Sequence, residues 1–316
     1  MDTTLVGSSQ VIMSVLQSLS KAAKCDKNVL LLGETGTGKD IAARKIHELS
    51  SRAACSFIAI NCSNFSENLF ESELFGHTRG AFTGAIDEKP GLLEAAGNGT
   101  IFMDEIGEIP LHLQARFLRV LDKKETRKIG ATQNKLIKAR FVFATNKDLR
   151  GSVLDGTFRQ DLFYRINILV IRLPPLPERK EDLPELVAHF VEREKAKSGN
   201  HKLVTAEALA KLRAHDFPGN IRELENLLER AFVYSESEKI GPDDIHLDPG
   251  NGSSHRPPMV DVLEETLRQC RWNRTQAALR LVKSRMQFYR IMDKYQLVEH
   301  KRSDKTEKQP GWTGNK

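Results

Sequence analysis

The feature that most constrains the fold is a glycine-rich loop between a short apolar run and an amphipathic segment. The loop is Gly33-Glu34-Thr35-Gly36-Thr37-Gly38-Lys39; it follows the apolar run Val29–Leu32 and leads into a helical pattern over Ile41–Leu49. Glycines let the backbone curl so that its N–H groups and the helix N-terminus face bound phosphate oxygens, and Lys39 adds a positive charge. The sequence therefore predicts a strand, a phosphate-binding loop and a helix in succession.

Further short apolar runs have the length expected of buried strands. They are Phe57–Ile60, Thr100–Met103, Phe141–Ala144 and Ile168–Ile171, and helical patterns such as Leu113–Leu121 separate them. Strands that alternate with helices predict an α/β fold with a parallel sheet covered by helices on both faces.

The strand signals stop after residue 177, and three helical patterns follow. They are Leu183–Glu194, Thr205–Ala214 and Ile221–Tyr234, with Thr205 as an N-cap. We expect an α/β subdomain over residues 1–172, a helical lid over 173–248, a linker over 249–258, a helix-turn-helix unit over 259–298 and a disordered tail over 299–316.

Charge and cysteine content bound the class of protein. The net charge is +6, and residues 255–316 alone hold 14 Lys and Arg against 7 Asp and Glu. Such a basic end suits a polyanionic partner, although a solvated tail has the same charge. The four cysteines lack metal-ligand spacing, and no apolar run approaches the roughly 20 residues that span a bilayer. We expect a cytoplasmic protein without a membrane partner.

Two acids follow the apolar run that starts at Thr100. This arrangement places one carboxylate, Asp104, on a Mg²⁺ ion and turns the other, Glu105, toward an attacking water. Asp40 follows Lys39 where a hydroxyl residue is usual, so metal binding leans more on Asp104. The sequence therefore predicts an enzyme that hydrolyses a nucleoside triphosphate with the help of Mg²⁺.

Hydrolysis also needs a group that senses the γ-phosphate and positive charge on the transition state. Asn146 ends the Phe141–Ala144 run with a short amide suited to sensing. Arg159, Arg165 and Arg222 could share an anionic ligand, although a single Arg is most often a surface ion pair.

The segment Gly80-Ala81-Phe82-Thr83-Gly84-Ala85 holds an aromatic residue between glycines on a predicted loop. It stands within Glu73–Ala85, and this loop sequence resembles that of the AAA+ activators of sigma-54-dependent transcription, the bacterial enhancer-binding proteins similar to the nitrogen-regulation and phage-shock activators. The resemblance runs from about Leu5 to Leu297 and is most specific in this loop.

The resemblance implies that the enzyme is an ATPase and that its nucleotide is ATP. It also implies a role for several of these residues. The six loop residues would contact the sigma factor, chiefly through Phe82 and Thr83. Asn61 would hold Glu105 inactive, Asn146 and Arg222 would be the two sensors, and Arg159 and Arg165 would reach a neighbour's ATP. Active sites between subunits imply a ring, commonly hexameric, and an acidic residue at position 40 is usual in this family.

The basic end of the chain contains two short helical patterns with N-caps at Thr275 and Ser284. They resemble a Fis-type helix-turn-helix, in which Arg285, Gln287 and Arg290 would face DNA; periodicity alone favours a generic helical bundle. Val282 stands at the turn position where Gly is usual, and Lys283 replaces an apolar residue.

We expect a transcription activator that binds upstream DNA and uses ATP hydrolysis to open promoter DNA held by sigma-54 RNA polymerase. One alternative is a DNA-binding regulator that acts by occupancy, and another is an AAA+ unfoldase or helicase. The segment 122–139 fits either a second substrate-facing loop or a solvated hairpin. We expect the activating signal to come from a separate protein or from a domain missing from the chain.

Overall fold

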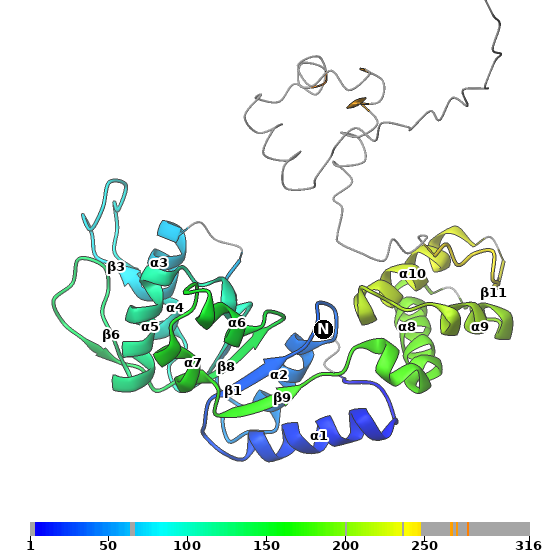
Figure 1. The fold of residues 1–316 in the computed structure, drawn as a ribbon, viewed down its shortest axis with the longest axis horizontal. Helices are drawn as coiled ribbons and strands as arrows, with labels where there is room; N and C mark the ends of the chain where they lie inside the picture. The colour runs from blue at the N-terminus through cyan, green and yellow to red at the C-terminus, as the bar shows by residue number, and fades with distance from the viewer. Residues whose placement is uncertain are drawn as a thin grey trace, which may run out of the picture. The chain divides into compact units, whose positions relative to one another are not determined.

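The computed structural model describes residues 4–63, 67–199, 201–235 and 237–247, together with residues 266, 267, 270 and 277. The chain divides into one compact unit over Met1–Asp248 and another over Pro249–Lys316. The first unit holds all the strands that the structure describes and a group of helices beyond them (Figure 1).

A five-stranded sheet forms the centre of the first unit. Its order is β2-β5-β8-β1-β9, and every neighbouring pair is parallel. The bounds are Phe57–Asn61 for β2, Thr100–Asp104 for β5, Arg140–Thr145 for β8, Val29–Leu32 for β1 and Leu169–Arg172 for β9. The predicted parallel α/β fold is therefore confirmed, and its strand predictions hold to within two residues.

Helices cover both faces of this sheet because its strands are apolar on both sides. α1 (Gln10–Ala23) and α2 (Lys39–Glu48) pack on one face, in a cluster that includes Ile12 and Ile46. The other face packs against α5 (Leu111–Lys123) and α7 (Gln160–Ile166), around Phe117. The remaining elements of this subdomain are α3 (Glu67–Phe75), α4 (Leu92–Ala95), η1 (Ile106–Glu108), α6 (Leu149–Leu154), β3 (Gly76–His77), β4 (Lys89–Pro90), β6 (Glu125–Thr126) and β7 (Lys135–Leu136).

The helical part that follows has its own apolar cluster, which includes Leu183, Leu212 and Phe232. It contains η2 (Leu176–Asp182), α8 (Leu183–Ser198), α9 (Ala206–Ala214) and α10 (Asn220–Tyr234). The predicted N-cap is confirmed, because Thr205 accepts a hydrogen bond from the Ala208 N–H. The expectation that strands end before this part was wrong, because β10 (Leu203–Val204) pairs with β11 (Lys239–Ile240). The sequence did not show these strands because two residues are too few to form a periodic pattern.

No helix of the described residues is both long and apolar enough to cross a bilayer.

Phe117 tests the packing between the sheet and α5. Its ring is fully buried and meets Phe141 and Phe143 edge-on, with centroids 5.8 and 6.1 Å away. Phe117→Ala should lower the free energy of unfolding by about 3–5 kcal/mol because it leaves a cavity. Leu154→Ala, at a side chain that is 88% exposed, should change the free energy of unfolding by less than about 0.5 kcal/mol. Urea titration of both variants measures these changes. Equal losses would contradict this packing.

Candidate active site

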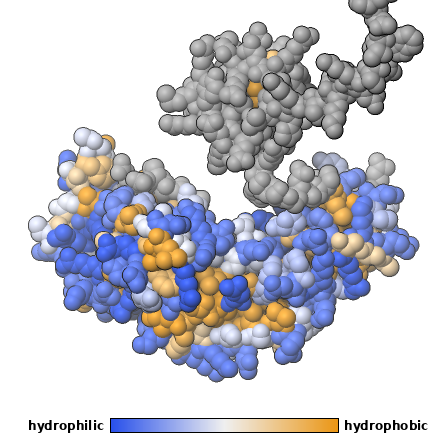
Figure 2. Space-filling view, in the orientation of Figure 1, coloured by the Kyte–Doolittle hydropathy of each residue, from blue (hydrophilic) through white to orange (hydrophobic). Residues whose placement is uncertain are grey.

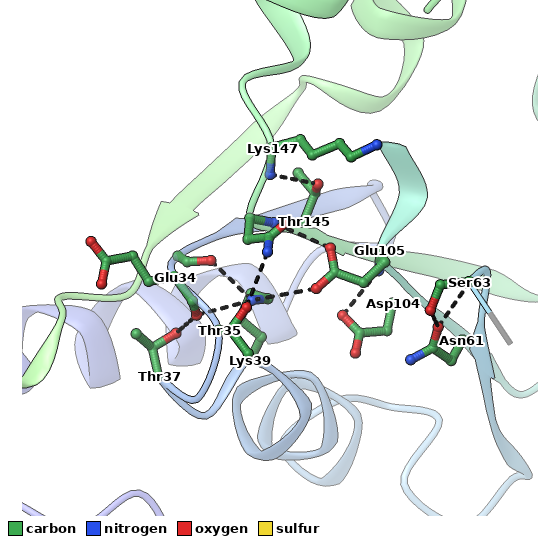
Figure 3. Close-up of polar contacts among 12 residues, drawn as sticks. Glu34, Thr35, Thr37, Lys39, Asn61, Ser63, Asp104, Glu105, Thr145 and Lys147 are labelled. Atoms are coloured by element: carbon green, nitrogen blue, oxygen red, sulfur yellow. Dashed lines mark hydrogen bonds and ion pairs between the residues drawn. The ribbon is translucent and has the colours of Figure 1, made fainter. Parts of the chain in front are cut away.

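The glycine-rich loop forms the turn between β1 and α2, as predicted, and its lysine points into the loop. Lys39 Nζ donates to the carbonyl oxygens of Gly33 (2.9 Å) and Glu34 (3.1 Å) and lies 4.0 Å from Glu105 Oε1 (Figure 3). The residue is 6% exposed, so the charge is held at one point rather than sampling solvent. An ammonium fixed in a glycine-rich loop that precedes a helix N-terminus is a phosphate-binding arrangement.

Two glycines of the loop adopt backbone conformations that other residues avoid. Gly36 has φ +81° and Gly38 has φ +90°. A Cβ on Gly36 would lie 2.3 Å from the carbonyl oxygen of Gly219 in the helical part, so the loop and that part touch through backbone atoms. The loop sequence therefore sets its own curvature and its contact with the lid.

The two acids at the end of β5 lie at the same edge of the sheet as this loop. Asp104 Oδ1 accepts the Glu105 N–H at 3.0 Å, and Glu105 adopts the left-handed region with φ +52°. Burial raises the pKa of both carboxyl groups, although the Lys39 charge acts in the opposite direction. A carboxylate made more basic in this way suits a group that takes or orients a proton.

Asn146 lies beside both the acids and the loop. Its side-chain Nδ2 donates to Thr35 Oγ1 at 3.0 Å, and its backbone N–H lies 3.4 Å from Glu105 Oε2. The register that pairs Leu32 with Thr145 accounts for this proximity, because the chain leaves both strands at the same edge. The structure thus brings Asn146, Glu105 and the phosphate loop together.

Asn61 ends β2 at the position paired with Asp104, but its side-chain oxygen bonds to Ser63 rather than to a group on Glu105. Its Oδ1 accepts from the N–H (2.9 Å) and the hydroxyl (2.6 Å) of Ser63, as Figure 3 shows. The structure places Asn61 near the acids without a bond to Glu105, so its restraining role stays a prediction.

The helical part contributes two residues to this edge. Arg222 lies in the first turn of α10; its Cβ would be 3.1 Å from a Cβ on Gly36, and its charge slightly opposes the rise that burial causes in the pKa of Asp104. Asn220, which sequence reasoning missed, is fully buried and donates to Glu34 Oε2 (3.0 Å) and to the Thr35 carbonyl oxygen (3.1 Å). Its position two residues before a predicted sensor was the available signal.

The two other arginines bond to residues outside the phosphate loop. Arg159 pairs with Asp161 at 2.7 Å, and Arg165 pairs with Asp122 at 2.9 Å. The Arg165 carbonyl oxygen accepts from Asn28, which precedes β1, whereas the phosphate loop follows β1. β1, which is four residues or about 13 Å long, therefore lies between the Arg165 carbonyl contact and the phosphate loop.

A magnesium ion fits the acids at this edge. Among the described residues no group of three or more His, Cys, Asp or Glu could hold a metal ion. Mg²⁺ needs no such group, because it commonly binds one or two carboxylates together with phosphates and water. Asp104, half-buried beside Asp40 and Lys39, supplies a carboxylate of this kind, and Asp40 is an exposed second one.

The loop over residues 80–85 forms a compact turn with its aromatic side chain partly outside. Gly80 N–H donates to the Ala85 carbonyl oxygen (2.9 Å), while Gly80 and Gly84 have φ +77° and +101°. Phe82 is 45% exposed, and its ring contacts His77 at 5.0 Å between centroids. Thr83, at the tip, is exposed.

Comparison with protein families decides the affiliation. Residues 5–172 match the sigma-54 interaction domain, residues 177–260 match the AAA+ ATPase lid domain, and residues 261–295 match the bacterial regulatory proteins of the Fis family. The chain belongs to the sigma-54-dependent activator family. The predicted affiliation is confirmed, as are the lid and the Fis-type helix-turn-helix of the predicted architecture.

Individual relatives agree with this affiliation. The response regulator protein PilR of Pseudomonas aeruginosa is 39% identical over 297 residues, 89% of this chain and 67% of PilR. The Nif-specific regulatory protein of Azotobacter vinelandii is 43% identical over 264 residues, and the match covers 84% of this chain and 50% of that protein. The chain therefore spans about half to two thirds of the length of these two relatives.

Solved structures of a related protein support nucleotide binding by this fold. NtrX from Brucella abortus in complex with ATP matches with a TM-score of 0.73 and 27% identity over 93% of this chain and 70% of that one. Its complex with ADP matches with a TM-score of 0.72 and 27% identity over 94% of this chain and 70% of that one.

The predicted DNA-contacting residues lie outside the described residues. They are Thr275, Ser284, Arg285, Gln287 and Arg290.

Glu105→Gln tests the electrostatics of the acid pair. Burial raises the folded-state pKa of Glu105 above its usual 4.5, so the ionised side chain destabilises the fold at neutral pH. The variant should therefore have the higher melting temperature at pH 7–8, and the difference should shrink as the pH falls toward 4.5, where wild-type Glu105 takes up its proton. Thermal unfolding between pH 4 and 8 measures this, and a difference that grows toward low pH would contradict the raised pKa.

Proposed function

We propose that the chain is an ATP-hydrolysing activator that binds upstream DNA and converts the closed complex of sigma-54 RNA polymerase into an open one. The observation that carries this proposal is the meeting of Lys39, Glu105 and Asn146 at one sheet edge. An exposed aromatic loop on the same subdomain supplies a surface for the client.

The chemistry follows from the residues at that edge. Lys39 and the loop N–H groups would neutralise the outer phosphates, while Asp104 would hold Mg²⁺, which would supply further positive charge against the phosphates. Glu105 would orient a water and take up its proton as the water oxygen bonds to the γ-phosphorus. The bond from that phosphorus to the bridging oxygen breaks, which releases ADP and phosphate. Asn146 would contact the γ-phosphate and change partner when it leaves.

The positions of Arg159 and Arg165 support assembly into a ring, for which we propose six subunits. Both side chains are exposed, and among the described residues neither bonds to its own phosphate loop. An arginine in this place would serve a neighbouring ATP, where it would stabilise transition-state charge.

An exposed apolar surface near β9 and α7 further supports self-association (Figure 2). Tyr164, Ile168 and Val170 are 65%, 47% and 45% exposed. The adjoining groove of about 730 Å³ is lined by Leu30, Leu32 and Asn146, among others. Contiguous apolar surface of this kind marks an interaction site, and a neighbouring subunit would cover it.

Contacts through Arg116 support a mechanical connection between the acids and the exposed loop. Arg116 lies in α5, which begins shortly after Glu105, and its guanidinium stacks on the Phe75 ring of α3 at 3.8 Å. It also pairs with Glu71 of α3 and donates to the Arg127 carbonyl oxygen. A shift of α5 during hydrolysis would thus be passed to α3, which leads into the loop.

Thr83→Ala tests the proposal because it separates hydrolysis from its use. Thr83 is exposed and carries no role at the sheet edge, so ATPase activity should stay within about twofold of wild type. Open-complex formation in transcription reactions with sigma-54 polymerase should fall at least tenfold. Lys39→Ala is the matched control and should abolish both. Parallel loss of both activities in Thr83→Ala would mean that the loop is structural.

Mixing subunits tests where Arg159 acts. Arg159→Ala subunits retain an intact phosphate loop, and Lys39→Ala subunits retain Arg159, so neither should hydrolyse ATP alone. Mixed rings contain interfaces with one intact copy of each residue, and hydrolysis should reappear at a level set by the mixing ratio. Continued inactivity in rings whose mixed composition is verified by native mass spectrometry would argue for action within one subunit.

A further inference from the structure

A short turn of the lid lies directly on the phosphate loop. The turn comprises residues 215–221 and leads into α10. At its end the Ile221 N–H donates to the Gly36 carbonyl oxygen at 3.0 Å, and Gly219 leaves no room for a side chain at Gly36. The lid therefore touches the loop by main-chain atoms, which fixes their spacing more narrowly than flexible side chains could.

Asn220 uses its whole side-chain amide to join three segments at this contact. Its Nδ2 donates to Glu34 Oε2 at 3.0 Å and to the Thr35 carbonyl oxygen at 3.1 Å. Its Oδ1 accepts the Leu176 N–H at 2.8 Å, at the start of the lid. Asn220 has no exposed surface, and its amide N–H groups and its amide oxygen all bond to other parts of the protein. A residue without these groups would leave the buried Leu176 N–H or the Thr35 carbonyl oxygen without its partner.

The backbone of this turn is held in an uncommon conformation. Phe217 and Asn220 have φ +46° and +56°, the left-handed region that non-glycine residues rarely occupy. Glu223 secures the turn, because its carboxylate accepts from the Gly219 N–H at 2.7 Å and lies 2.7 Å from His215 Nε2. Outliers of this kind persist only where surrounding contacts enforce them, and they gather at functional sites.

Thr35 connects this turn to the catalytic edge. Its carbonyl oxygen accepts from Asn220, and its hydroxyl accepts from Asn146. One loop residue thus bonds to the group predicted to sense the γ-phosphate and to the lid. Arg222 directly follows this turn, in the first turn of α10.

We infer that Asn220 is a positioning residue that sets the angle of the lid on the phosphate loop and thereby directs Arg222 at the nucleotide. The inference rests on the proposed function, since it concerns the same nucleotide site. Asn220 itself acts through Glu34, Thr35 and Arg222 and needs no contact with the phosphates.

Asn220→Asp tests the inference in the 316-residue chain. The aspartate still accepts from Leu176, but it places an oxygen against Glu34 and the Thr35 carbonyl. Fluorescent ADP should bind about tenfold more weakly, the effect of one lost charge-assisted hydrogen bond. In a Glu34→Gln background the introduced amide can donate to the new aspartate, so the same substitution should weaken binding less than threefold. This rescue reports direct pairing, which general loss of packing would not produce.

Three further variants complete the experiment. Asn134→Asp makes the same change at another Asn–Glu pair, where Asn134 donates to Glu125 at 2.9 Å in the β6–β7 hairpin, and it should leave ADP affinity unchanged. In an Arg222→Ala background, Asn220→Asp should add little further loss, because both act through one group. Asn220→Gly, which tolerates the left-handed backbone, replaces Asn220→Asp in the affinity comparison if the aspartate variant does not fold.

The outcomes separate this inference from the proposed function. If the wild-type chain binds no nucleotide, the proposed function fails. If the wild-type chain binds and hydrolyses ATP, two results together overturn the positioning role. The first is that Asn220→Asp weakens ADP binding equally with and without Glu34→Gln. The second is that its effect on ADP affinity adds fully to the effect of Arg222→Ala.

Discussion

The interaction on which the rest of the site depends is the bonding of Lys39 to its own loop. The ammonium group is almost fully buried, and the carbonyl oxygens of Gly33 and Glu34 hold it within hydrogen-bonding distance. A buried charge is tolerated only with partners of this kind. Because β1 lies between β8 and β9, the same charge also stands beside the ends of the neighbouring strands and 4.0 Å from Glu105.

Two structural connections lead outward from that point. Thr35 and Gly36 touch the lid turn, which carries Asn220 and Arg222. On the other side, Glu105 precedes η1 and α5, and Arg116 of α5 stacks on α3 below the exposed loop. Short contacts therefore connect the phosphate loop and the neighbouring acids both to the lid and to the helix that precedes the exposed loop; the proposed function requires a change at the phosphates to travel through them.

Sequence reasoning predicted the sheet and the phosphate loop well because their signals are local. A buried parallel strand is a continuous apolar run, and a phosphate loop needs its glycines at particular positions, as Gly36 and Gly38 show. It failed for β10 and β11, which are two-residue strands stabilised by partners distant in sequence. Asn220 was missed for a similar reason, since its importance comes from Glu34, which is 186 residues away.

The central claim is that nucleotide turnover at the sheet edge moves the loop around Phe82. Spin labels at Thr83 and at Leu154, both exposed, would report the separation of the loop from α6 by pulsed electron paramagnetic resonance. The account predicts that the distance distribution of the assembled protein shifts between an ADP–metal fluoride transition-state analogue and ADP. An identical distribution in both states, in a sample that hydrolyses ATP, would contradict it.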